Sequence, residues 1–174
     1  GIDIIGVLRA ALKNISGQGH EGASTITMQV ARNFFLSSER TFKRKINEIL
    51  LAIKIEDSLS KEEILELYIN QIYLGQRAFG FSAAANAYFN KSLDELNLAE
   101  SALLAGLPKA PSRYNPLINP ELAIQRQQAV LRSMLRHGYI DNPTYQIALE
   151  EPINLRDSVS KRELKADYVA EMVR

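Results

Sequence analysis

Apolar residues recur at helical spacing over most of this chain. Between Ile4 and Ile15 they repeat every three or four positions, with Arg9 and Lys13 between them, which predicts an amphipathic helix. A glycine-rich polar turn over residues 16–22 separates it from a second predicted helix at about residues 25–35. No stretch alternates convincingly between apolar and polar residues, so few strands are expected. The pattern indicates an all-α, or mainly α, fold.

A third helix is predicted from about residue 39 to residue 56. Its apolar positions form one stripe with two further residues on the opposite side: Phe42, Ile46, Ile49, Leu50 and Ile53 against Leu51 and Ile55. Because a helix that is apolar on both sides is usually central in its domain, we expect this helix to be packed on both faces.

Capping signals predict where later helices begin. Ser60 with Glu63, and Asn97 with Glu100, have the spacing of capping boxes. The helix after the first box should stop near Gly75, and a proline at position 108 should end the helix after the second.

Three more helices are predicted in the second half of the chain. They cover residues 82–89, residues 120–137 before a glycine, and a stretch that starts at residue 142; Asn-Pro pairs open the last two. Beyond residue 152 the sequence becomes polar and charged. We therefore assign residues 1–152 to one domain and residues 153–174 to a connector.

Composition narrows the chemistry. Of 174 residues, 46% are hydrophobic and 24% are charged, as in one ordinary folded domain. A net charge of +1 gives no general attraction to nucleic acid. The lack of cysteine excludes disulfides and thiolate metal sites, and two histidines are too few for a histidine-built metal site.

The ends of the chain show no targeting or anchoring signal. No apolar run reaches the roughly 18 residues of a membrane-spanning helix. The chain starts at Gly1 without methionine and ends inside a helical pattern. We interpret both ends as cuts through a longer protein.

Glu48 is the most informative acidic residue. On a helix, Arg44 lies four residues before it and Lys45 three residues before it, so the three side chains share a surface. One interpretation is an exposed ion pair worth a few tenths of a kcal/mol. The other is a carboxylate held among apolar neighbours such as Leu51 and Ile55, which must then be paired.

The region around Glu48 is locally basic, with a net charge of +4 over residues 32–54. Arg32, Arg40 and Arg44 could converge on a dianion such as a diphosphate. A solvated basic face is the alternative. Nucleic-acid binding is a weaker rival, because no aromatic residues alternate with these bases.

Residues 22–33 are rich in hydrogen-bond donors. A glycine followed by Ser24 and a threonine indicates first of all a helix N-cap. Ser24, Thr27, Gln29 and Arg32 also gather near a predicted helix start, and such a start suits a phosphate.

Four segments together resemble a known family. Residues 22–29 (GASTITMQ), 44–48 (RKINE), 61–70 (KEEILELYIN) and 80–85 (GFSAAA) are similar to the second to fifth signatures of the peptidoglycan glycosyltransferases of family 51, in the same order and spacing. Residues 107–116 (LPKAPSRYNP) resemble the class A bifunctional penicillin-binding proteins, in which a transpeptidase domain follows.

The resemblance implies a lysozyme-like, almost all-helical fold, here truncated at its N-terminus. It implies an enzyme that polymerises lipid II into β-1,4-linked glycan strands, with inversion at the anomeric carbon and release of undecaprenyl diphosphate. Such enzymes act at the outer, periplasmic face of the bacterial cytoplasmic membrane. Their general-base glutamate belongs to a first signature that would lie before Gly1, so we expect this fragment to be inactive alone.

The resemblance also implies site roles. Glu48 maps onto the second catalytic carboxylate, which stabilises the leaving group by positioning cations, either neighbouring bases or a divalent ion such as Mg²⁺. No cofactor is otherwise expected. Met28 cannot donate a hydrogen bond and is left out. The residues expected to contact diphosphate and sugar are Ser24, Gln29, Arg32, Asn33, Arg40, Arg44 and Lys45.

Other interpretations remain open at this point. The helix from Ile4 to Ile15 lies on the membrane surface by family resemblance, whereas its periodicity fits an ordinary core helix almost equally well. Paired-carboxylate chemistry would also suit a muramidase-like lytic enzyme. A third candidate is a non-catalytic helical module that binds a membrane or a partner protein.

Overall fold

The computed structural model describes residues 24–35 and 41–156. The predictions for residues 4–15, for Arg40 and for most of the connector lie outside the described residues. Within the described ranges the regular elements are helices, and the sole extended pairing is an isolated bridge between Tyr73 and Phe79. The predicted all-α fold is confirmed.

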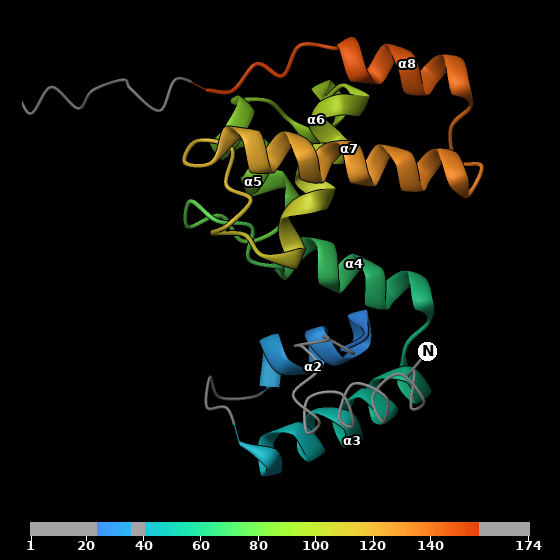
Figure 1. Ribbon diagram of the computed structural model, residues 1–174. Coiled ribbons are helices and arrows are strands. Elements are labelled where there is room, and N and C mark those ends of the chain that lie inside the picture. The colour runs from blue at the N-terminus through green and yellow to red at the C-terminus, as the bar shows by residue number, and fades with distance from the viewer. Residues whose placement is uncertain (1–23, 36–40, 157–174) are drawn as a thin grey trace, which may run out of the picture. The chain divides into compact units, whose positions relative to one another are not determined.

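The chain forms two compact units, of which the first comprises residues 1–72. Its described helices are α2 (Ile26–Phe35), α3 (Phe42–Ser58) and α4 (Lys61–Gln71). Helix α2 lies between α3 and α4 and packs against both, as Figure 1 shows. The buried side chains at these contacts include Met28, Val30, Ala31, Ala52, Ile55 and Ile64.

Local hydrogen bonds set the helix boundaries in this unit. Helix α3 begins three residues later than predicted, because the Thr41 side chain accepts the Arg44 N–H at 3.1 Å. The capping box of Ser60 and Glu63 at the start of α4 is confirmed. This cap lowers the pKa of Glu63, chiefly through the Ser60 backbone N–H. Helix α4 ends at Gln71, before the predicted stop near Gly75.

The prediction that α3 packs on both faces is wrong for the described structure. Phe42, Ile46, Leu50 and Ile53, which we call the outer stripe of α3, are exposed, and Phe42 is 93% exposed. The buried face instead carries Glu48, Ala52 and Ile55. Periodicity located both faces of the helix, but the more apolar stripe is not the one that α2 covers.

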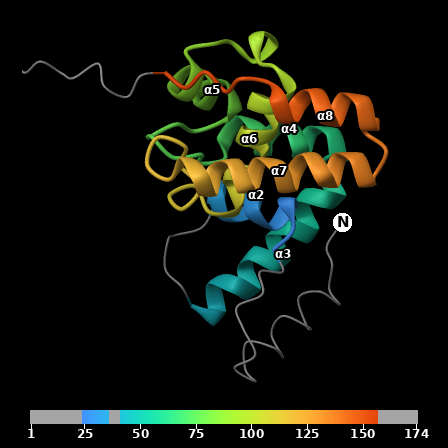
Figure 2. The same ribbon diagram turned by 45° about the horizontal axis from the view of Figure 1, so that its top comes forward.

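The second unit comprises residues 73–174. Its described elements are α5 (Phe81–Phe89), the 3₁₀ turn η1 (Leu93–Glu95), α6 (Leu98–Gly106), the 3₁₀ turn η2 (Leu107–Lys109), α7 (Pro120–Arg136) and α8 (Asn142–Glu150). Helix α7 runs beside α6 and α8 in Figure 2. Ala102, Leu131 and Ala148 form the shared core of these three helices. All four predicted helix starts in this unit agree with the structure within one residue.

Two buried polar groups tie this second unit together. The Tyr88 hydroxyl donates to the Leu74 carbonyl at 2.8 Å, and burial, with a smaller contribution from Tyr73, raises the pKa of Tyr88 to about 12. Lys91 Nζ lies 2.8 Å from both carboxylate oxygens of Glu100, which is fully buried. Each group has a partner inside its own unit, as burial requires.

Candidate functional site

Glu48 lies at the centre of a charged cluster on the buried face of α3. Its side chain is 1% exposed, and both carboxylate oxygens are engaged. Oε2 accepts from Arg44 Nη1 at 2.9 Å, and Oε1 accepts from Lys45 Nζ at 2.6 Å. Of the two interpretations of Glu48, the structure supports the carboxylate that is buried and paired.

Ser24 joins this cluster from the segment just before α2. Lys45 Nζ donates to Ser24 Oγ at 2.8 Å, and Ser24 Oγ donates to Glu48 Oε1 at 3.4 Å. The lysine ammonium is therefore held between a carboxylate and a hydroxyl. We call Ser24, Arg44, Lys45 and Glu48 the Glu48 cluster.

The start of α2 is held locally by the residue after Ser24. Met28 N donates to Thr25 Oγ1 at 3.3 Å, so Thr25 provides the N-cap. The predicted helix start is confirmed, and its cap leaves the Ser24 hydroxyl for the cluster.

The Glu48 cluster carries a surplus positive charge, because two cations share one carboxylate. The Arg44 side chain is 17% exposed and Lys45 is 35% exposed, so both are reachable from solvent. Arg44 Nε is buried and has no hydrogen-bond partner among the described residues. Buried donors are normally satisfied, and an anionic ligand beside Arg44 would satisfy this one.

The other predicted contact residues are not drawn into the cluster. Gln29 is partly buried, and Arg32 and Asn33 are exposed on α2; none contributes a hydrogen bond or ion pair to Glu48 within the described part of the chain. Arg32 instead lies near Tyr68 on α4. Burial raises the pKa of Tyr68, and the positive charge of Arg32 partly offsets this rise. Arg40 lies outside the described residues. Their predicted contacts with a ligand remain predictions.

The described residues provide no cluster of protein ligands for a divalent metal at Glu48. They contain no group of three or more histidine, cysteine, aspartate or glutamate side chains that could hold an ion. Arg44 and Lys45 already occupy both Glu48 oxygens. These two contacts by themselves account for the pairing of the buried carboxylate.

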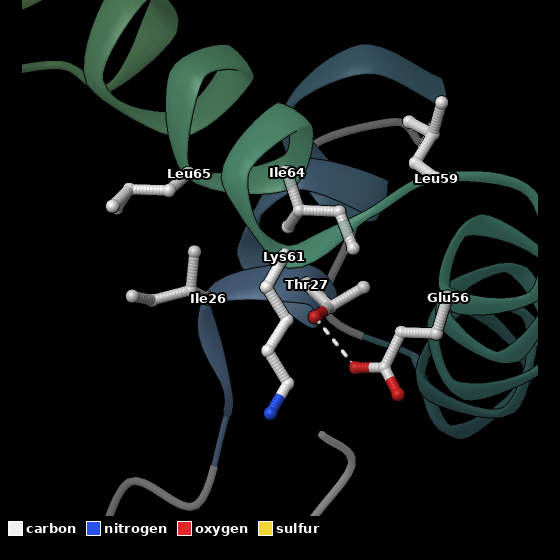
Figure 3. A pocket seen from close by; sticks show the side chains of 7 residues that line it. All are labelled: Ile26, Thr27, Glu56, Leu59, Lys61, Ile64 and Leu65. Carbon is white, nitrogen blue, oxygen red and sulfur yellow. Dashed lines mark hydrogen bonds between the residues drawn. The ribbon is translucent and has the colours of Figure 1, made fainter.

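A separate pocket of about 320 Å³ lies among α2, α3 and α4. Figure 3 shows its lining, which is mostly apolar, with Glu56 and Lys61 as the charged members: Ile26, Thr27, Glu56, Leu59, Lys61, Ile64 and Leu65. Thr27 Oγ1 donates to Glu56 Oε1 at 2.7 Å along its wall. Glu48 does not line this pocket.

The Thr27–Glu56 contact was not anticipated from the sequence. From the sequence, Glu56 marks the predicted end of a helix, and Thr27 belongs to a donor-rich cluster. The two residues are 29 positions apart. No local spacing signal links residues that meet only because α2 packs on α3.

Comparison with known proteins defines the class. The family described as Transglycosylase matches residues 1–135, and the chain belongs to that family. The resemblance found in the four sequence signatures is thereby confirmed.

The chain is similar to proteins called penicillin-binding protein 1A. It is 56% identical over 175 residues to the protein of that name from Pseudomonas aeruginosa, covering 100% of this chain and 21% of that protein. It is 59% identical over 175 residues to the one from Neisseria gonorrhoeae, covering 100% of this chain and 22% of that protein. The chain thus spans about a fifth of the length of these curated relatives.

A solved structure agrees with this assignment. The crystal structure of penicillin-binding protein 1A from Haemophilus influenzae superposes with a TM-score of 0.57 at 40% sequence identity, covering 87% of this chain and 19% of that one. None of the helices in the described ranges has both the length and the apolar character needed to cross a bilayer.

Proposed function

We propose that this chain is part of a peptidoglycan glycosyltransferase. The reaction is the polymerisation of lipid II into β-1,4-linked glycan strands, with inversion at the anomeric carbon and release of undecaprenyl diphosphate. Membership of the transglycosylase family supports the class of reaction. The Glu48 cluster is the observation that carries the proposal for these residues.

The cluster suits the leaving group of this reaction. Negative charge grows on the diphosphate oxygen as its bond to the sugar breaks, and positioned cations stabilise that charge. Arg44 and Lys45 supply the cations, and Glu48 holds them in place through contacts of 2.9 Å and 2.6 Å. Because buried Glu48 is already paired, its role is to position these cations.

The remaining parts of the proposal follow the family resemblance. Gln29, Arg32, Asn33 and Arg40 contact the sugar and diphosphate groups. A general base that precedes Gly1 activates the attacking hydroxyl, and a transpeptidase domain follows in the same full-length protein. The enzyme works at the periplasmic face of the cytoplasmic membrane, and residues 4–15 lie on the membrane surface.

The test uses the full-length protein with lipid II in detergent or vesicles. Wild type should produce glycan strands, and Glu48→Gln should lower kcat by roughly 10²-fold or more, as for other losses of transition-state charge stabilisation. Glu66→Gln, an exposed change on α4, is the matched control and should act like wild type. Strands as abundant with Glu48→Gln as with wild type would refute the role of Glu48.

A lytic enzyme is the competing outcome of the same experiment. It would reduce the turbidity of purified cell walls without any lipid diphosphate. The cationic cluster argues against it, because a neutral sugar leaving group needs no such cations. Failure of the wild-type protein to act on either substrate would favour a non-catalytic helical module.

A further inference from the structure

Two polar contacts join α2 and the segment just before it to different points along α3. The first is at the Glu48 cluster, where Ser24 meets Lys45 and Glu48. The second is eight residues further along α3, where Thr27 Oγ1 donates to Glu56 Oε1 at 2.7 Å. On a helix, eight residues correspond to about 12 Å, so the second contact lies outside the cluster.

The placement of Ser24 depends on how α2 sits on α3. Ser24 precedes the first helical residue, and only three positions separate it from Thr27. The intervening turn is fixed by the cap from Met28 N to Thr25 Oγ1. A shift of Thr27 along α3 is therefore transmitted to Ser24 and to the ammonium of Lys45, which Ser24 holds.

Apolar packing and a hydrogen bond both act on this register. The buried face includes Ala31 on α2 and Ala52 on α3, both with no exposed surface, beside larger buried residues such as Met28 and Ile55. A hydrogen bond is directional, and its partner distance leaves little freedom. Thr27 is only 4% exposed, so its hydroxyl must find a protein partner, and Glu56 provides one.

We propose that Thr27 and Glu56 form a positioning pair that fixes Ser24, and through Ser24 the Lys45 ammonium, for the leaving-group step. This inference rests on the proposed function. Neither residue touches the reacting atoms; their contact holds the cluster in register. A misplacement of about 1 Å is enough to cost up to roughly 10²-fold in rate.

The test compares Thr27→Val with Thr27→Ser in the full-length protein. Valine keeps the shape of threonine and removes the hydroxyl, whereas serine keeps the hydroxyl. Thr27→Val should lower kcat about tenfold with KM changed less than about twofold, because the cluster acts on charge that develops in the transition state. Thr27→Ser should recover most of the rate.

A matched control separates positioning from loss of stability. Ile64→Val removes one methylene from a buried residue of the same pocket and should lower thermal stability slightly without touching the Thr27–Glu56 bond. The kcat of Ile64→Val should equal that of wild type, although the variant is less stable to heat. A second check is Glu56→Ala, which should also lower kcat, because it removes the acceptor of the Thr27 hydroxyl.

The outcomes distinguish the two proposals. A wild-type protein that makes no glycan strands overturns the proposed function itself. An active wild type with Thr27→Val as fast as Ile64→Val overturns the positioning role alone. Equal rates for Thr27→Ser and Thr27→Val, both below wild type, also overturn it, since the hydroxyl would then be irrelevant.

Discussion

The ammonium of Lys91 lies 2.8 Å from each carboxylate oxygen of Glu100, whose side chain is fully buried in the second unit. Glu100 also accepts the Asn97 N–H at 3.1 Å, as the capping box of α6 requires. One buried carboxylate thus joins the start of α6 to the segment after α5. All the contacts described for this pair are made within the second unit.

Removing the lysine should be more harmful than removing the glutamate charge. Lys91→Met leaves a buried carboxylate without its cation, which costs about 3–5 kcal/mol. Glu100→Gln keeps the cap, and Lys91, whose side chain is 29% exposed, can turn toward water, so a smaller loss of about 1–2 kcal/mol is expected. Hydrogen exchange of α6 amides in the full-length protein measures both losses.

The exposed Lys109 provides the control for this pair. Lys109→Met should change local stability by less than about 0.5 kcal/mol. Equal protection of α6 amides in Lys91→Met and Lys109→Met proteins would contradict the assignment of the buried ion pair.

Gly75 and Gly138 should respond differently to alanine. Both have positive φ, +89° and +74°. A Cβ at Gly75 would lie 2.5 Å from the Tyr88 hydroxyl oxygen, whereas nothing lies within 4 Å at Gly138. Gly138→Ala should cost about 1–2 kcal/mol from backbone conformation alone, and Gly75→Ala should cost more because buried Tyr88 must also move. Thermal unfolding of the two variants compares them, and equal losses would refute the steric contribution.

Alkaline pH should weaken the second unit through Tyr88. Its pKa is raised from 10.0 to about 12, so stability is fully present below pH 10 and is lost as pH rises from 10 toward 12. The unfolded chain ionises this hydroxyl first, which favours unfolding by about 2 kcal/mol at the upper end. Urea unfolding at pH 9 and pH 11.5 measures the difference.

Tyr88→Phe is the matched variant for this pH effect. It lacks the titrating hydroxyl, so its stability should fall less between the two pH values, although it starts lower because the bond to the Leu74 carbonyl is lost. A pH response identical to that of wild type would show that other groups cause the alkaline loss.

Arg44 and Glu48 should act as one unit in catalysis. Arg44→Met and Glu48→Gln should each lower kcat/KM strongly, and the double variant should be little slower than the slower single variant, because the members of a network are not additive. Polymerisation rates of the wild type, both single variants and the double variant with lipid II give this double-mutant cycle. Multiplicative losses would mean that the 2.9 Å contact has no part in positioning.

The sequence predicted helix starts better than helix partners. Ser60 with Glu63 and Asn97 with Glu100 form their caps from nearby residues, so spacing alone was sufficient. Burial of Glu48 is one of two alternatives that the sequence leaves open, and it follows from the apolar neighbours Leu51 and Ile55 on the same helix. Thr27–Glu56 and Lys91–Glu100 depend on tertiary packing, which no local pattern encodes.

The outer stripe of α3 is exposed, so α3 can be modified there without changing its opposite face, which carries Glu48. Phe42 is 93% exposed, so replacing it with a polar residue or a spectroscopic label leaves no cavity. A label at this position would report on motion of α3 while the charged groups stay untouched. Fewer apolar side chains in water would also reduce the tendency of concentrated protein to aggregate.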